Sequence, residues 1–279
     1  MGAPPGVLVA VQTLLANPKI QWPCIAMPVV AMNTSQSDFR IRDLMHHELP
    51  GSLYLVVQPA DADRLRPLIR LVLTQIVRRL TEHMEFEGGR SVAQYQHRLL
   101  LLIDEFASLK RLTVIEEALA SMAGYGLKAY LIVQDLQQIH SAYGRDEGLI
   151  GNCHIRIAYA PNKIETAELL SRMAGQTTVV RRQTSISGLR SGGLSRGSRT
   201  ETMQEVQRAL ITPDEVMRLP SARKDAQGNV LEPGHLLVFV AGQAPIYGRQ
   251  ILYFRDSTFQ QRAQIEAPKV SDRIDAEVD

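Results

Sequence analysis

The chain has 279 residues, enough for one α/β domain or two small ones with a sizeable core. Its net charge of +2 means that contacts with nucleic acid must come from local basic clusters rather than from an overall positive field. Two cysteines exclude a disulfide framework and a cysteine-based zinc site. The sequence shows neither a signal peptide nor an apolar run near the roughly 18 residues of a membrane span, so we expect a soluble chain.

Prolines interrupt residues 1–50 repeatedly, which predicts an irregular N-terminal segment. LYLVVQP at 53–59 is typical of a buried strand, and residues 61–84 have the apolar spacing of an amphipathic helix. The arginines of this helix are predicted to form its solvated face: Arg66, Arg70, Arg78 and Arg79.

Apolar strands and amphipathic helices alternate after a polar link at 85–97. The predicted elements are a strand at 99–103, a helix at 112–124, a strand at 128–134, a short helix from Asp135, a strand at 154–160 and a helix at 162–175. This alternation predicts a mainly parallel sheet with helices on both faces.

The later part of the chain has a different composition. Residues 181–203 are rich in Ser, Gly and Arg, which predicts a mobile loop. A short helix at 212–219 precedes a predicted antiparallel pair at 235–242 and 244–254. We therefore expect one domain over 51–260, followed by a polar tail at 261–279.

Two adjacent carboxylates follow the apolar strand in LLLLIDEF (99–106). They stand at the carboxyl end of a strand, where α/β sheets bind ligands. In nucleotide hydrolases the first acid of such a pair holds Mg²⁺ and the second polarises the attacking water. This chemistry assigns Asp104 to the metal and Glu105 to the water. The alternative is that the two acids only begin the next helical element.

Gln134 is a polar residue placed where the next strand ends. Because parallel neighbours end at one edge of a sheet, its side chain is a candidate sensor of the γ-phosphate. The alternative is that Gln134 only caps the helix that follows. The carboxylates one strand earlier favour the sensor.

Several stretches resemble the TraG/TraD-type coupling proteins of conjugation and type IV secretion. The stretches are LLLLIDEFASL (99–109), AGYGLKAYLIVQDLQQI (123–139) and IGNCHIRIAYAPNKIETAELLSRMAGQTTV (150–179), and the resemblance covers most of 28–273. It implies an α/β fold of the RecA-like P-loop NTPase kind, with ATP and Mg²⁺ as cofactors. It also matches Asp104 and Glu105 to the family's Walker B pair and Gln134 to its third motif.

The Walker A loop of that family has no counterpart here. No G-x-x-x-x-G-K-[ST] occurs, nor any Gly-Lys pair, so the lysine and the loop that cradle phosphates are missing. We expect the C-terminal portion of a longer coupling protein, incomplete at the N-terminus and inactive as an ATPase alone. We expect the family's membrane anchor to be missing from this chain as well. The family works at the cytoplasmic face of the bacterial inner membrane, whereas this chain is expected to be soluble in the cytoplasm.

The resemblance implies an ATP-driven motor that delivers relaxase-bound single-stranded DNA to the proteins of a type IV secretion channel, and that assembles as a hexamer. The alternative is a non-catalytic fragment that binds DNA or protein. A secretion ATPase that powers pilus assembly is disfavoured by NCHIRIAYAPN and TAELLSR, and a helicase by the lack of unwinding motifs.

Arginines supply two further candidate contacts. Arg156, in a shared stretch, is a candidate arginine finger toward a neighbouring subunit, with a salt bridge or surface contact as the alternative. The basic 181–203 segment is a candidate contact for DNA phosphates, with a solvated loop as the alternative. Its arginines are Arg181, Arg182, Arg190, Arg196 and Arg199.

Overall fold

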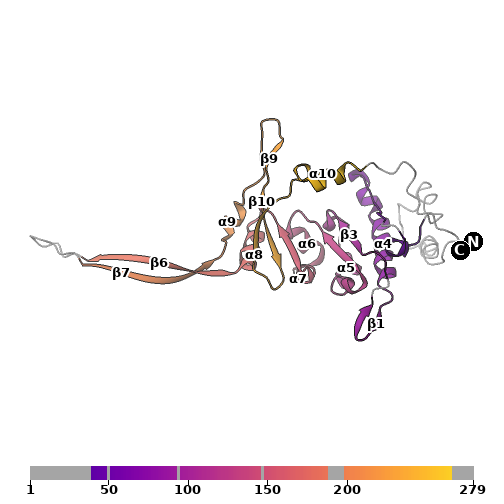
Figure 1. The fold of residues 1–279 in the computed structure, drawn as a ribbon, viewed down its shortest axis with the longest axis horizontal. Helices are drawn as coiled ribbons and strands as arrows, with labels where there is room; N and C mark the ends of the chain where they lie inside the picture. The colour runs from indigo at the N-terminus through magenta and orange to yellow at the C-terminus, as the bar shows by residue number, and fades with distance from the viewer. Residues whose placement is uncertain (1–38, 49–50, 93–94, 146–147, 188–197, 266–279) are drawn as a thin grey trace, which may run out of the picture. The chain divides into compact units, whose positions relative to one another are not determined.

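A computed structural model of the chain describes residues 39–48, 51–92, 95–145, 148–187 and 198–265 (Figure 1). The chain forms two compact units, which meet in the sequence between Asn152 and Cys153. Most of the predicted N-terminal segment 1–50 and of the tail 261–279 lies outside the described residues. None of the described helices has the length and apolarity needed to cross a membrane.

The first unit begins with a short helix, α3 (Asp43–His46), and the 3-10 turn η1 (Pro59–Asp61). The strand predicted at 53–59 is wrong: residues 51–58 form no strand, and Tyr54 and Val56 are more than four-fifths exposed. Apolar β-formers become a strand only where another strand offers hydrogen bonds. The predicted helix is confirmed as α4 (Ala62–Leu80).

The predicted polar link is a small hairpin of β1 (Glu85–Glu87) and β2 (Arg90–Val92), with two glycines of positive φ at its turn. The apolar strand that follows is β3 (Leu99–Ile103), and it pairs in parallel with β4 (Leu127–Leu131). The crossover between them consists of η2 (Phe106–Leu109), α5 (Thr113–Ala118) and η3 (Met122–Tyr125). The helix predicted at 112–124 is thus broken into two shorter pieces.

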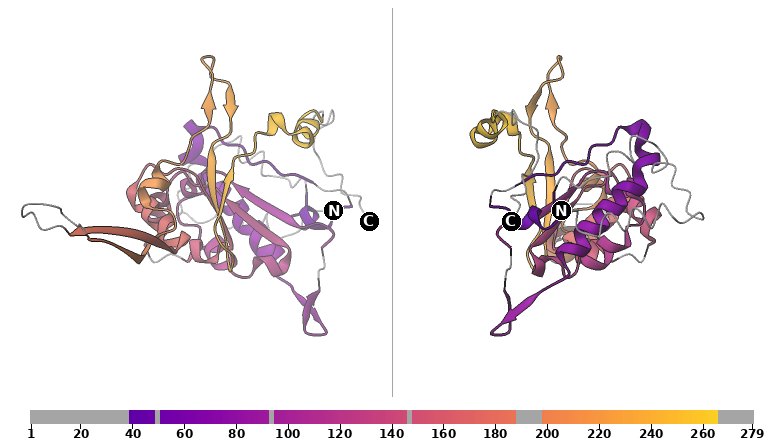
Figure 2. Two further views of the ribbon diagram at one scale, coloured as in Figure 1. Left: turned by 60° about the vertical axis from the view of Figure 1, so that its left-hand side comes forward. Right: turned by 90° about the vertical axis from the view of Figure 1, so that its right-hand side faces the viewer.

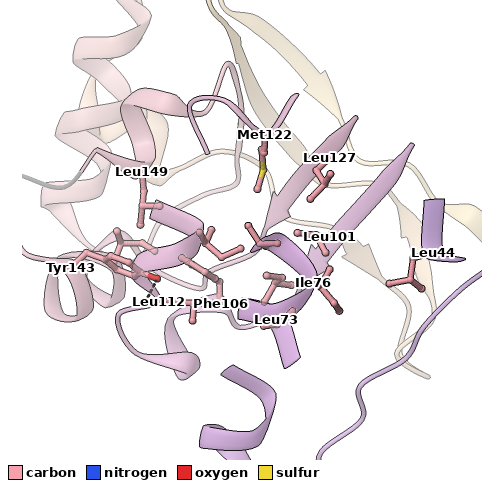
Figure 3. Close-up of a cluster of buried hydrophobic side chains, with 14 of the residues drawn as sticks. Leu44, Leu73, Ile76, Leu101, Phe106, Leu112, Met122, Leu127, Tyr143 and Leu149 are labelled. Atoms are coloured by element: carbon pink, nitrogen blue, oxygen red, sulfur yellow. Dashed lines mark hydrogen bonds between the residues drawn. The ribbon is translucent and has the colours of Figure 1, made fainter. Parts of the chain in front are cut away.

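The core of the first unit lies on one face of the β3–β4 pair (Figure 3). Leu101 and Ile103 are buried there against α4, α5 and α6 (Leu136–Tyr143). Leu100 and Leu102, on the opposite face, are 55% and 61% exposed. The prediction of a strand buried on both faces is therefore wrong, because the packed helices of this unit cover only one of them.

The second unit is built on an antiparallel sheet in the order β11 (Ile246–Arg249), β10 (His235–Val240) and β5 (Ile155–Ala158). Helices α8 (Ile164–Ala174) and α9 (Pro213–Met217) pack on it through a small apolar core. The predicted closing pair is confirmed with shorter strands. Among the described strands, parallel pairing is confined to β3 and β4, although the sequence predicted a mainly parallel sheet.

Two paired strands replace the ends of the mobile loop predicted at 181–203, while its residues 188–197 lie outside the described part of the chain. Strand β6 (Gln176–Ser187) pairs with β7 (Ser198–Ala209) over twelve positions, and this arm leaves its unit beside α8 (Figures 1 and 2). For the described residues the prediction was wrong because it gave the Ser and Gly content more weight than the Thr, Val and Ile residues that favour strands. A second hairpin, of β8 (Arg223–Lys224) and β9 (Val230–Glu232), and the segments η4 (Tyr253–Arg255) and α10 (Ser257–Ala263) complete the unit.

Candidate functional site

The carboxyl ends of β3 and β4 bring Glu105 and Gln134 into contact. Beyond the strands the ladder continues, since Ile132 N–H donates to Ile103 O at 3.0 Å and Phe106 N–H donates to Ile132 O at 2.9 Å. Gln134 Nε2 then donates to Glu105 Oε1 at 2.7 Å. The expectation that both polar ends meet at one edge of the sheet is confirmed by this hydrogen bond.

Glu105 has a left-handed backbone, with φ 45° and ψ 45°. This conformation is costly for a residue with a Cβ and is found at functional sites. The N–H of Glu105 donates to Asp104 Oδ1 at 2.9 Å. Glu105 is the residue at the N-cap of the following 3-10 turn, but its carboxylate accepts no capping hydrogen bond from the backbone of that turn. The acids thus precede the helical turn, as the alternative expects, but the Glu105 side chain does not cap it.

Gln134 does not cap the helix after β4 either. That helix, α6, is capped by Asp135, whose carboxylate accepts from Gln137 N–H at 2.8 Å. The backbone N–H of Gln134 donates to Gln138 Oε1 at 3.2 Å, which leaves its side-chain amide turned to Glu105. The Gln134 side chain is exposed.

The turn after Glu105 is held by side chains whose contacts could not be predicted from the sequence. Phe106 is fully buried and stacks on Tyr143, with ring centroids 5.6 Å apart. Arg66 Nε donates to Ser108 O at 2.8 Å, and Arg70 donates to Leu109 O at 2.6 Å. The predicted solvated face of α4 is therefore wrong for these two arginines, although Arg78 and Arg79 are exposed as expected.

The site fits one part of a magnesium–nucleotide complex. Mg²⁺ takes oxygen ligands and keeps several waters, so a single carboxylate such as Asp104 is a suitable protein contact. Among the described residues no group of three or more His, Cys, Asp or Glu side chains gathers as a metal cage. The three polar side chains at this edge are exposed and offer acceptors and one amide, not a phosphate cradle.

The predicted arginines belong to the second unit. Arg156 lies on β5 opposite Phe239, is half-buried, and donates from Nε to Cys153 O at 2.9 Å. Arg181 and Arg182 are exposed on β6. The register places Arg199 on β7, while Arg190 and Arg196 lie outside the described residues.

A sequence model of the family described as "Type IV secretory system Conjugative DNA transfer" matches residues 17–276. The chain belongs to this family. It is 54% identical to a conjugal transfer protein TraG of Escherichia coli over 252 residues, which are 89% of this chain and 39% of that protein. It is 28% identical to the protein VirD4 of Rhizobium radiobacter over 84% of this chain and 31% of VirD4. The chain therefore spans well under half the length of these two relatives.

Solved structures of the conjugative coupling protein TrwB share its fold. The unbound form of TrwB aligns with a TM-score of 0.56 at 22% identity, over 77% of this chain and 44% of that one. TrwB in complex with ADP and Mg²⁺ aligns with a TM-score of 0.55 at 20% identity, again over 77% of this chain, and 43% of that one. The RecA-like α/β fold class expected from the sequence is confirmed by these neighbours.

Proposed function

We propose that this chain supplies the metal-binding and water-activating side of the ATP site in a conjugative coupling protein. That protein would use hydrolysis to deliver relaxase-bound single-stranded DNA to the type IV secretion channel. The observation that carries the proposal is the Glu105–Gln134 hydrogen bond, next to Asp104, where two parallel strands end. A strained acid, bonded to a neutral amide at this edge, is an arrangement suited to phosphoryl transfer.

Each of the three side chains has a role in the proposal. Asp104 would hold Mg²⁺ through water, and Glu105 would accept a hydrogen bond from the attacking water and orient it. Gln134 would exchange its bond with Glu105 for one with the γ-phosphate and so report the nucleotide. The bound Mg²⁺–ATP would supply the phosphoryl group and the charge that neutralises its oxygens.

The phosphate cradle would come from residues that this sequence does not contain, since it has no Walker A loop. The chain by itself would then not turn over ATP. In the whole protein we propose a hexamer at the cytoplasmic face of the inner membrane, with Arg156 as the arginine that reaches a neighbour's nucleotide.

A second candidate function, DNA binding without catalysis, is favoured by the two faces of the β6–β7 arm. Opposite and alternate residues of a hairpin share a face. By register, the two acids of the paired strands, Glu201 and Glu205, lie on the same face as Arg182. Arg182 Nη1 is 3.8 Å from Glu201 Oε2. Arg181 lies on the acid-free face opposite Gln204, so it is the better candidate for contact with phosphates.

The proposal is tested in a chimera, in which this chain replaces the matching part of the E. coli TraG protein that is 54% identical to it. The measurement is conjugal transfer by a strain that lacks its own copy. We expect transfer with the unchanged chimera and with Glu117→Gln, an exposed acid on α5. We expect loss of transfer with Glu105→Gln. Transfer by the Glu105→Gln chimera at the unchanged level would contradict the proposal.

A further inference from the structure

The segment 106–112, which follows Glu105, is held from a second side by Tyr143. The hydroxyl of Tyr143 accepts a hydrogen bond from Leu112 N–H at 3.0 Å, drawn in Figure 3, and lies 3.5 Å from Lys110 O, to which it donates. Tyr143 is 6% exposed, and its ring lies almost flat against Phe106, at 18°. One side chain thus contacts both ends of the segment.

Tyr143 is also the last residue of α6, the helix that begins at Leu136 and is joined to Gln134 by its cap residue Asp135. The eight residues of α6 therefore connect Gln134 at one end to the clamp on segment 106–112 at the other. Glu105 and Gln134 are therefore linked in two ways. Their side chains form a hydrogen bond, and α6 connects Gln134 to Tyr143, which stacks on Phe106 next to Glu105.

We propose that Tyr143 is a positioning residue, which holds segment 106–112 so that Glu105 keeps its left-handed backbone and meets Gln134. This inference rests on the proposed roles of Glu105 and Gln134. The inference adds that α6 couples the movements of Glu105 and Gln134. A displacement of Gln134 is transmitted through Tyr143 to the turn that carries Glu105.

The physical reason lies in the backbone of Glu105. A residue with a Cβ stays in the left-handed region only where its surroundings determine it more strongly than its own preference. On the C-terminal side of Glu105 those surroundings include the buried Phe106 ring and the bonds of Tyr143 to the backbone of Lys110 and Leu112, besides the bonds from Arg66 and Arg70. Lys110 also has a positive φ, 58°, so the clamp contacts a second residue in a costly backbone conformation.

Removing only the hydroxyl of Tyr143 distinguishes its positioning role from the packing of its ring. A phenylalanine at position 143 would fill nearly the same space and keep the stack on Phe106. It would lose only the bonds to Leu112 N–H and Lys110 O, and it would leave the buried Leu112 N–H without its partner. Tyr143→Phe is therefore the variant that removes the clamp with the least change to the core.

The test is a coupling measurement by ¹⁵N NMR on the folded chain, without nucleotide. The side-chain amide signals of Gln134 are identified as those that Gln134→Ala removes. Glu105→Ala is expected to shift these signals in the wild-type background, because it removes the acceptor at 2.7 Å. In the Tyr143→Phe background we expect Glu105→Ala to cause less than half of that shift. In Tyr125→Phe, whose ring packs against the same core, we expect the full shift.

An equal shift in the wild-type and Tyr143→Phe backgrounds would overturn the inference. If Tyr143→Phe fails to fold, hydrogen exchange of the Leu112 amide in the wild-type chain tests the clamp instead. Protection of at least about 100-fold over an unstructured chain supports the clamp, and exchange at the unprotected rate overturns it. Because no nucleotide is used, transfer by the Glu105→Gln chimera at the unchanged level would count against the proposed function without altering the coupling that this experiment measures.

Discussion

The side-chain amide of Gln134 donates a 2.7 Å hydrogen bond to the carboxylate of Glu105, 29 residues earlier in the chain. The contact joins the carboxyl ends of the two parallel strands β3 and β4. It places an acid with a strained backbone beside a neutral amide, and both side chains are exposed. Under the proposed function, a nucleotide that enters this edge would meet both side chains.

Strain at Glu105 predicts an unusual response to glycine. Glu105→Gly removes the Cβ that makes φ 45° costly, and we expect it to raise the free energy of unfolding by about 0.5–1 kcal/mol. Glu117→Gly, on α5, removes the same side chain from a helical backbone and should lower it by about 0.5–1 kcal/mol. Urea unfolding of both variants measures the difference, and a loss of stability in Glu105→Gly would show that the backbone is not strained.

Phe106 is expected to be the main apolar anchor of the same turn. Because its side chain is fully buried and stacked on Tyr143, Phe106→Ala should cost about 3–5 kcal/mol of unfolding free energy. Phe86→Ala, on the exposed hairpin strand β1, should cost less than about 0.5 kcal/mol. Thermal or urea unfolding compares them. Similar losses in the two variants would argue against the packing described for segment 106–112.

The two faces of the β6–β7 arm predict different effects for neighbouring arginines. Arg181→Ala should weaken binding of a single-stranded oligonucleotide about 3- to 10-fold and lower the salt slope by about 0.7. Arg182→Ala should change affinity less than about twofold, since Arg182 lies within 4 Å of Glu201 and shares its face with Glu205. Fluorescence anisotropy at several salt concentrations measures both. The reverse order, or equal losses, would contradict the assignment of the acid-free face.

Acid should weaken the junction between α9 and β7. The pKa of Glu215 is lowered by the hydrogen bond from Thr212 N–H, then by the bonds from Arg208 and the Thr212 hydroxyl. A carboxyl whose folded pKa is depressed stabilises the fold above its ordinary value of about 4.5 and loses that effect as pH falls through the folded pKa. Glu215→Gln keeps the capping geometry without the charge.

The check is the melting temperature of both chains from pH 7 to pH 3. We expect wild type to melt higher at neutral pH and the two curves to converge at the acid end. A constant difference over the whole range would mean that the charge of Glu215 is not what stabilises the junction.

Much of the site could be predicted because it depends on local patterns. An apolar run that ends in two acids, followed by a second run that ends in Gln134, predicts two neighbouring strands with polar carboxyl ends. The left-handed backbone of Glu105 and the clamp by Tyr143 could not be predicted, because they arise from contacts between segments distant in sequence. The arginine contacts of α4 were missed for the same reason.

The errors in the fold have a related cause. Residues 53–58 have strand-forming side chains, yet a strand also needs hydrogen bonds from a neighbour, which composition does not reveal. For the β6–β7 arm, the Ser and Gly residues of 181–203 led to the prediction of a loop, although β6 and β7 pair with each other over twelve positions. In both segments pairing, rather than propensity, decided the outcome.

The most direct measurement of the central claim is ATP hydrolysis by the purified TraG chimera with and without Glu105→Gln, alongside binding of a fluorescent ATP analogue with Mg²⁺. We predict unchanged analogue binding and at least about a 100-fold loss of hydrolysis in Glu105→Gln, with Glu117→Gln close to the unchanged chimera. Hydrolysis in Glu105→Gln within about threefold of the unchanged chimera would contradict the assignment of Glu105 as the residue that activates water.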